Sequence, residues 1–170
     1  EEIKSLIDVG TGAGFPGIPL KIVYPDIEVV LMDSLNKRVK FLNEVIEQLG
    51  LKNINAVHGR AEDFAKNKEF RDSFDICVSR AVANMSTLSE YCIPFVKVDG
   101  LFIPYKSEKI TEELANANNA LHILGGKVVD QIDYNLPDSD YYRNLVIVKK
   151  EKETPKKYPR KAGLPSKEPL

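Results

Sequence analysis

The sequence predicts an α/β fold in which helices cover both faces of a mostly parallel sheet. Three observations lead to this prediction. Short apolar runs alternate with segments of helical periodicity along most of the 170 residues, which implies strands joined by right-handed crossovers. A glycine-rich turn follows the first apolar run. The last two apolar runs are joined by residues 135–143, too few for a crossover helix, so they should pair antiparallel.

The predicted elements follow the hydrophobic pattern in order. Strands are expected at residues 3–9, 27–32, 53–58, 74–78, 101–105, 127–134 and 144–149. Helices are expected at residues 16–23, 35–49, 85–95 and 108–124, with a helical turn at 61–66. Ser34 and Ser107 are expected to cap two of these helices, and Pro16 suits the first position of another. The pattern therefore predicts a Rossmann-like fold with an antiparallel last strand.

Composition limits the class of protein. Apolar residues at 43% and charged residues at 29% are typical of a globular chain. No apolar run approaches the ~18–20 residues of a membrane span, and two cysteines predict no disulfide framework. We therefore expect a cytoplasmic protein that does not contact membranes. The oligomeric state stays open, with a monomer favoured. Because the chain opens almost directly on the first strand, we also expect that a native N-terminal segment is missing.

The glycine-rich turn contains Gly10, Gly12 and Gly14 and can hold a ligand directly on its backbone. Residues 12–17 fit G-x-G-x-x-G, the dinucleotide motif. Read from Asp8, the same stretch fits acidic-x-Gly-x-Gly-x-Gly, the first motif of S-adenosyl-L-methionine (SAM) methyltransferases. A carboxylate repels a pyrophosphate but attracts the ammonium and sulfonium of SAM. The sequence thus favours SAM, and a nicotinamide-dependent oxidoreductase is the alternative.

Ligands of such sheets bind at the carboxyl ends of the strands, so the first two strand ends predict cofactor-binding residues. Gly10, Gly12 and Phe15 follow the first strand and are expected to cradle the cofactor. Asp33 follows the second strand about 20 residues beyond the glycines, where a carboxylate can accept from both ribose hydroxyls. Asp33 could instead be a helix-start charge that the helix dipole favours.

The next two strand ends add three candidates. Ala61 and Glu62 follow the third strand, where a backbone amide and a carboxylate could meet the adenine amino group. Glu62 could equally be a solvated side chain in a first helical turn. Arg80 follows the fourth strand, and its planar fork suits the carboxylate of SAM or an RNA phosphate. The alternative for Arg80 is a surface ion pair.

No catalytic residue is assigned. The sequence has no Ser/His/Asp set, paired carboxylates or metal-ligand spacing, and the fourth strand lacks the Asn/Asp-Pro-Pro-Tyr motif of enzymes that methylate amines. Cys77 falls within a strand and Cys92 on an apolar helix face, so both are expected in the core. A ring nitrogen such as guanine N7 presents a lone pair and needs no general base, so its methylation would rely on alignment.

The C-terminal residues 151–170 differ from residues 1–150, the predicted SAM-binding domain. From residue 149 onward, eight Lys and Arg face three Glu, whereas the rest of the chain is acidic. This Pro- and Lys-rich stretch has no periodicity and predicts an extended tail that orders on binding a polyanion. A solvated basic tail is the alternative. The predicted RNA contacts are Lys156, Lys157, Tyr158, Arg160 and Lys161.

Five stretches also resemble a known family, the glucose-inhibited division protein B family of bacterial methyltransferases that modify guanine N7 in small-subunit ribosomal RNA. The matching stretches are residues 8–20, 33–38, 60–62, 79–81 and 158–165. The most specific is the last, Tyr-Pro-Arg-Lys-Ala-Gly-Leu-Pro. Members of that family carry an N-terminal helical segment before the first strand, which is absent here.

The resemblance implies a SAM-dependent enzyme of the class I methyltransferase fold. It implies SAM contacts at Gly10, Phe15, Ala61, Glu62 and Arg80 and RNA contact through the basic tail. The implied partner is 16S rRNA, either deproteinised or within the small ribosomal subunit. A non-catalytic RNA-binding module with the same fold remains an alternative.

Overall fold

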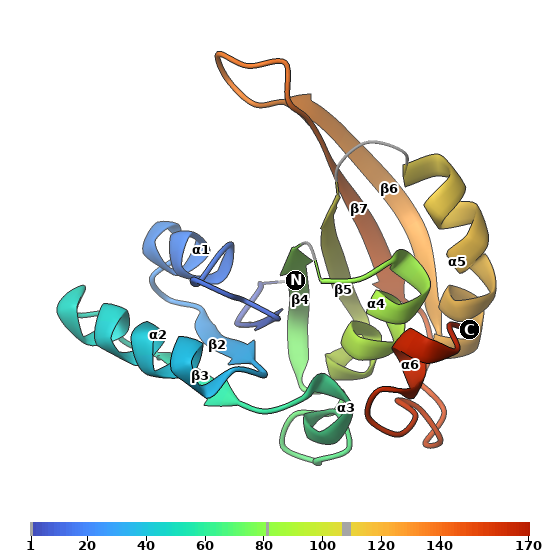
Figure 1. The fold of residues 1–170 in the computed structure, drawn as a ribbon, viewed down its shortest axis with the longest axis horizontal. Helices are drawn as coiled ribbons and strands as arrows, with labels where there is room; N and C mark the ends of the chain where they lie inside the picture. The colour runs from blue at the N-terminus through green and yellow to red at the C-terminus, as the bar shows by residue number, and fades with distance from the viewer. Residues whose placement is uncertain (1, 81, 107–109) are drawn as a thin grey trace.

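The computed structural model describes residues 2–80, 82–106 and 110–170, and its centre is a seven-stranded sheet of order β3-β2-β1-β4-β5-β7-β6 (Figure 1). The strands are β1 Ser5–Val9, β2 Glu28–Asp33, β3 Ile54–His58, β4 Phe74–Arg80, β5 Val96–Lys106, β6 Gly126–Asn135 and β7 Tyr142–Lys150. The helices are α1 Gly17–Val23, α2 Asn36–Gln48, α3 Ala61–Phe64, α4 Met85–Cys92, α5 Ile110–Leu124 and α6 Leu164–Lys167, with a 3₁₀ turn at Ile93–Phe95.

The sheet confirms the predicted fold class. β1 pairs in parallel with β2 and β4, and the parallel pairing continues to β3 on one side and β5 on the other. β7 pairs antiparallel with both β5 and β6. The chain runs outward from β1 to β3 and then returns to β4 on the opposite side. The carboxyl ends of β1 and β4 therefore border the crevice where ligands bind in such sheets.

Each central strand buries both faces, because successive side chains point to opposite sides of the sheet. Leu6 of β1 belongs to an apolar cluster with Ile18 of α1 and Leu42 of α2. Its neighbour Ile7 belongs to a second cluster, formed with residues of α3, α4 and α5. Helices α1 and α2 thus cover one face and α3, α4 and α5 the other.

Local differences from the predicted elements have physical causes. The Ser34 cap was wrong: α2 begins at Asn36, and the Leu35 amide donates instead to the Asp33 carboxylate at 2.9 Å. Pro16 precedes the first helical residue rather than occupying it. The helix expected at 85–95 narrows to a 3₁₀ turn near Pro94, whose nitrogen cannot donate a helical hydrogen bond. Ser107 lies outside the described residues.

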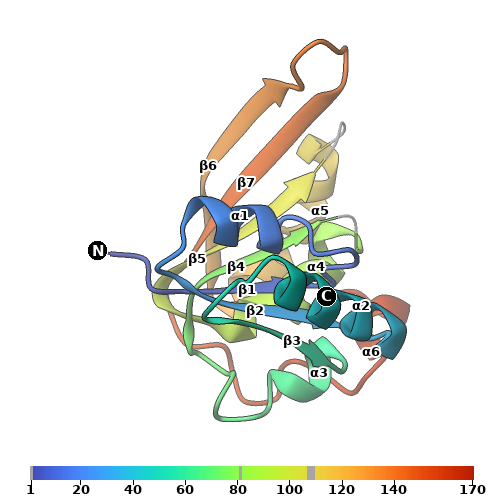
Figure 2. The same cartoon turned by 90° about the vertical axis from the view of Figure 1, so that its left-hand side faces the viewer.

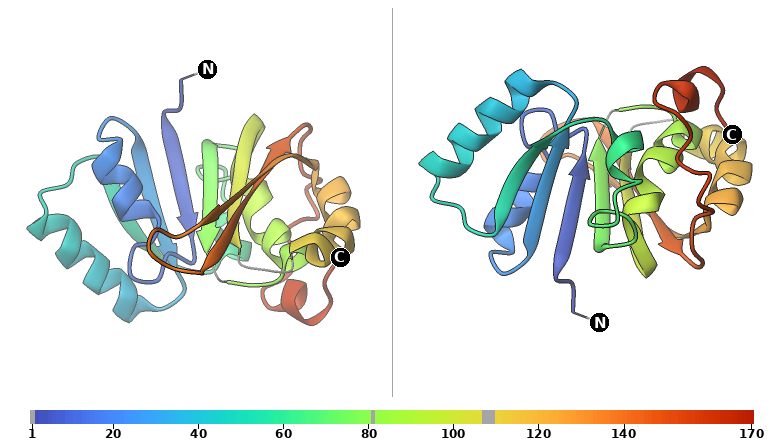
Figure 3. Two further views of the ribbon diagram at one scale, coloured as in Figure 1. Left: turned by 90° about the horizontal axis from the view of Figure 1, so that it is seen from above. Right: turned by 90° about the horizontal axis from the view of Figure 1, so that it is seen from below.

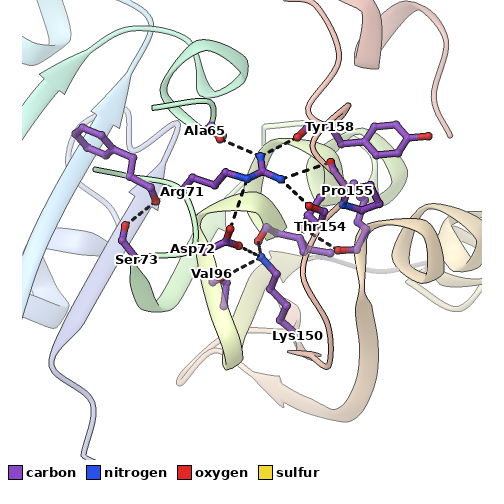
Figure 4. Close-up of polar contacts among 12 residues, drawn as sticks. Ala65, Arg71, Asp72, Ser73, Val96, Lys150, Thr154, Pro155 and Tyr158 are labelled. Atoms are coloured by element: carbon purple, nitrogen blue, oxygen red, sulfur yellow. Dashed lines mark hydrogen bonds and ion pairs between the residues drawn. The ribbon is translucent and has the colours of Figure 1, made fainter. Parts of the chain in front are cut away.

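The C-terminal segment, residues 151–170, is packed rather than extended, so the prediction of a tail that orders only on binding was wrong. It lies beside α4 and α5 and contains the short helix α6 close to its end (Figure 3). The Arg71 guanidinium donates to the carbonyl oxygens of Thr154 and Tyr158, at 2.7 and 2.8 Å (Figure 4). Tyr158 itself is only 7% exposed and belongs to the cluster of α4 and α5.

The hairpin of β6 and β7 extends beyond the rest of the sheet (Figure 2). Most of β6 is exposed, whereas alternate residues of β7 are buried against the body. This hairpin reaches the carboxyl end of the parallel strands, where the candidate site lies. Among the described residues, no helix has the length and apolar character needed to cross a membrane.

Candidate active site

The glycine loop after β1 is held by main-chain hydrogen bonds and is open toward the crevice. The amides of Gly10 and Thr11 donate to the Met32 carbonyl at 2.9 and 3.0 Å. Gly10 and Gly12 have φ values of 71° and 62°, which L side chains rarely adopt. A Cβ at Gly12 would meet nothing within 4 Å, and a Cβ at Gly10 would come within 2.5 Å of a Val82 methyl group. Gly12 therefore presents bare backbone to the crevice, and the absence of a side chain at Gly10 leaves room for Val82.

Asp8 lies beneath this loop and holds it together. Its Oδ2 accepts hydrogen bonds from Thr11 Oγ1 at 2.7 Å and from the Gly17 amide at 2.8 Å. The carboxyl group is fully buried, and burial raises its pKa to about 6. Asp8 lines neither of the two cavities beside the loop. The sequence argument treated Asp8 as a border of the ligand pocket, whereas its contacts in the structure are with the loop backbone.

Replacing Asp8 by Asn is expected to remove a pH dependence of stability. The pKa of Asp8 is raised in the folded state, so folding favours its protonated form. The contribution of Asp8 to the free energy of unfolding is therefore complete below its ordinary pKa and is lost as pH rises through about 6. The stability difference between Asp8→Asn and the parent should grow in favour of Asn from pH 4 to pH 6.5, by at most roughly 3 kcal/mol, and then level off. Urea unfolding across this pH range measures it, and a difference independent of pH would contradict the assignment.

Two cavities meet at Gly10. The larger has a volume of about 1000 Å³ and lies between the glycine loop, the ends of β4 and β5, and the β6–β7 hairpin. The smaller, of about 150 Å³, lies between the ends of β1, β2 and β3 and helix α4. Two carboxylates and one arginine border the smaller cavity, whereas four basic side chains, three aromatic ones and one carboxylate are among those that border the larger. This division fits a ligand with a hydroxyl- and amine-bearing end and a second, charged end.

All seven residues predicted to bind the cofactor border these cavities. Gly10, Gly12, Phe15 and Arg80 line the larger cavity. Gly10 also lines the smaller one, together with Asp33, Ala61 and Glu62. The strand-end argument thus brought together residues that are up to 70 positions apart in the sequence.

The two carboxylates of the smaller cavity are buried and held in place. Asp33 Oδ2 accepts from the Gly12 amide at 3.0 Å and pairs with Arg38 at 3.3 Å. Glu62 Oε1 accepts from the Gly163 amide at 2.9 Å. Acceptor groups at this position suit the hydroxyl and amino donors of an adenosine. The open glycine backbone and these paired acceptors therefore fit SAM.

Arg80 and Phe15 form a pair at the mouth of the larger cavity. The guanidinium carbon of Arg80 lies 5.6 Å from the centroid of the Phe15 ring. Both side chains are exposed. A guanidinium in this position can bind a carboxylate with two parallel hydrogen bonds while its face rests on the ring.

Several lining residues were missed by the sequence argument. They are Arg38, Tyr105, Lys106, Tyr134, Arg143 and Asn144 in the larger cavity and Tyr91 in the smaller. Tyr105 and Lys106 end β5, so the strand-end rule would have found them had it been applied to the fifth strand. Tyr134 and Arg143 come from the hairpin, whose position over the crevice no local pattern indicates.

The five residues predicted to contact RNA fall into two groups. Lys156, Lys157 and Lys161 are exposed. Tyr158 is buried in the core and unavailable for stacking on a base, which corrects that expectation. Arg160 is bonded through its Nε and Nη2 to the buried carboxylate of Glu90 at 2.7 to 3.1 Å. Within residues 2–80, 82–106 and 110–170, no cluster of three or more His, Cys, Asp or Glu could hold a metal ion.

Comparison with known proteins gives a family. Residues 1–137 match the family described as rRNA small subunit methyltransferase G, GidB. Ribosomal RNA small subunit methyltransferase G of Lachnoclostridium phytofermentans is 61% identical over 166 residues, which are 98% of this chain and 69% of the relative. Its counterpart in Acetivibrio thermocellus is 58% identical over 166 residues, 98% of this chain and 68% of the relative.

A solved structure supports the fold. TYW2 of M. jannaschii, solved in complex with AdoMet, superposes with a TM-score of 0.68 at 17% identity over 88% of this chain and 70% of its own. The likeness at this identity concerns the fold alone. The family match over residues 1–137 and the 61% identity to a relative decide the assignment. The chain belongs to the GidB family of SAM-dependent rRNA small subunit methyltransferases.

Proposed function

We propose that the protein transfers a methyl group from SAM to N7 of a guanine in 16S rRNA. The observation that carries this proposal is the pair of cavities that meet at Gly10, one bordered by acceptors for an adenosine and one wide enough for a base. The family supports methylation of small-subunit rRNA. The guanine and the ring position are our further step, supported by the side chains around the larger cavity.

The cofactor half of the site would use the seven predicted residues. Gly10 and Gly12 would offer bare backbone, Asp33 would accept from the ribose, and Glu62 beside Ala61 would accept from the adenine amino group. Arg80, resting on Phe15, would bind the carboxylate at the other end. SAM, when bound, supplies a methyl group on a positively charged sulfur, and these residues would orient it toward the larger cavity.

The larger cavity supports a target atom that carries its own lone pair. Among its described lining residues the one carboxylate is Glu113, which pairs with Lys106 at 2.6 Å. Burial raises the pKa of Tyr105, so its hydroxyl stays protonated and can donate. Cys77 and Cys92 are buried in the core and do not line the cavity. A side chain free to remove a proton from an amine, or a cysteine to attack a ring carbon, is therefore missing from the described wall, whereas guanine N7 needs neither.

RNA contact outside the cavity is proposed for the exposed lysines of the C-terminal segment, Lys156, Lys157 and Lys161. Their exposed ammonium groups can approach phosphates, although that of Lys157 also lies 5.2 Å from the centroid of the Tyr158 ring. Tyr158 and Arg160 are committed to the interior and would act on RNA binding only by holding this segment in place.

A methyl-transfer assay tests the proposal. The protein is incubated with methyl-labelled SAM and either assembled small subunits or deproteinised 16S rRNA, and N7-methylguanine is mapped by borohydride–aniline cleavage. Label in 16S rRNA with strand scission at one guanine is expected. Label without strand scission would mean that the enzyme methylates an atom other than N7. No label with either substrate would favour a non-catalytic RNA-binding module.

Arg80→Ala is expected to weaken SAM binding by about 10- to 100-fold, the loss of hydrogen bonds to a charged group. Isothermal calorimetry with SAM measures this. Lys97→Ala is the matched control, because it removes a positive charge at the amino end of β5, away from both cavities. Equal affinity of Arg80→Ala and the control would remove Arg80 from the site.

A further inference from the structure

The C-terminal segment makes a contact with the smaller cavity that a basic RNA-binding tail would not need. The Gly163 amide donates to Glu62 Oε1 at 2.9 Å, across 101 positions of sequence. Glu62 lines the smaller cavity and is only 4% exposed. A carboxylate at this depth is costly unless hydrogen bonds hold it, so the orientation of Glu62 depends on the segment that carries Gly163.

Gly163 itself is fixed by anchors on either side, and both anchors are on α4. On one side, Arg160 is bonded to Glu90, which is fully buried. On the other, the Pro165 carbonyl accepts from Thr87 Oγ1 at 3.0 Å. Between these anchors the backbone turns through a φ of 83° at Gly163. The left-handed turn at Gly163 thus directs its amide at Glu62.

A second contact joins the segment to the same cavity. The Tyr91 side chain lines the smaller cavity and lies close to the Ser166 side chain. The pKa of Tyr91 is raised by burial and further by the nearby carboxylate of Glu62. Two side chains of the cavity wall, Glu62 and Tyr91, therefore have neighbours in residues 163–166.

We propose that residues 158–168 are a positioning element of the cofactor site: the Gly163 amide holds one oxygen of Glu62 so that the carboxylate faces the adenine amino group. This inference rests on the proposed function, which assigns the smaller cavity to the adenosine of SAM. Gly163 is a positioning residue and does not itself contact the cofactor.

The test compares the affinities of two ligands, S-adenosylhomocysteine and S-inosylhomocysteine. The second carries a carbonyl oxygen where adenine carries its amino group, and a carboxylate repels that oxygen. The parent should prefer the adenosyl ligand by about 10- to 100-fold, the range of a hydrogen bond to a charged group. Calorimetric affinities supply a readout that does not depend on methyl transfer.

Gly163→Val is expected to reduce this preference about tenfold, because a β-branched residue is strained at positive φ and would displace the amide. Gly50→Val is the matched control: Gly50 has a φ of 61°, has open space at its Cβ position as Gly163 does, and lies at the end of α2. The control should keep the parental preference. Gly163→Asn, which tolerates the left-handed conformation, should also keep it.

The outcomes separate the inference from its foundation. A preference lost in Gly163→Val and kept in Gly50→Val and Gly163→Asn supports it. Parallel weakening of both ligands in Gly163→Val, with the preference intact, overturns it and leaves the cofactor assignment standing. A parent protein that binds the two ligands equally well overturns both the inference and the assignment of the smaller cavity to the adenosine of SAM. If Gly163→Val does not fold, Gly163→Ala, which adds a single methyl group, takes its place with the same expectations at smaller size.

Discussion

Replacing Arg160 by Met is expected to lower the free energy of unfolding by about 3–5 kcal/mol, the usual cost of leaving one member of a buried ion pair alone. Glu90 is fully buried in α4, and Arg160 donates to both of its carboxylate oxygens. The same contact raises the pKa of Arg160 above its ordinary value. Urea unfolding at pH 7.5 measures the effect.

Two variants check the reason for this loss. The double variant Glu90→Gln/Arg160→Met should recover most of the stability, because it leaves no buried charge unpaired and the Gln side-chain oxygen can still accept from the amide of residue 160. Lys161→Met removes the neighbouring exposed charge and should change stability by no more than about 0.5 kcal/mol. A similar loss in Arg160→Met and Lys161→Met would mean that the Glu90 contact does not stabilise the protein.

The Arg160–Glu90 ion pair is a contact that the sequence did not predict. Arg160 and Tyr158 belong to a run of Lys, Arg and Pro whose composition is typical of an extended basic tail. Glu90, the partner of Arg160, lies 70 positions earlier, and Tyr158 packs in a cluster with residues of α4 and α5. Charge and periodicity are local properties, so they did not reveal that two residues of this run are buried against distant elements.

The parallel sheet was predictable because its signals are local and repeated. Each strand is an apolar run, and each crossover helix has an apolar face that fits only beside the sheet. The ends of β1 to β4 then follow from topology, which is why Asp33, Glu62 and Arg80 were found without any knowledge of their contacts. The hydrogen bonds of Asp33 and Glu62 were beyond the same argument, since Gly12 and Gly163 donate them through backbone amides, which every residue except proline carries.

Asp8 illustrates a different limit. Its motif correctly indicated a SAM-dependent family, but the charge argument assumed a carboxylate open to the ligand. The structure buries it below the loop, where Thr11 and Gly17 use its lone pairs. The motif around Asp8 and the role of its carboxylate are therefore separate inferences. Whether the carboxylate contacts a ligand or supports the loop depends on its burial, which the sequence does not show.

The exposed lysines of the C-terminal segment are expected to contribute strongly to rRNA binding. Replacing Lys156, Lys157 and Lys161 together by Ala should weaken rRNA binding by about 10- to 100-fold near 0.15 M salt. The plot of log affinity against log salt should become less steep by about 2, because each lost phosphate contact removes roughly 0.7 to 0.9 from the slope. Filter binding of 16S rRNA from 0.05 to 0.3 M salt measures both quantities.

A charge-matched triple variant, Lys4, Lys40 and Lys52 to Ala, controls for net charge, since all three side chains are exposed outside the C-terminal segment. Its slope should stay close to that of the parent. SAM affinity should be the same in both triple variants, because none of the six lysines lines either cavity. Equal slopes for the two triple variants would assign RNA attraction to the overall charge, and the C-terminal segment would then support the cofactor site alone.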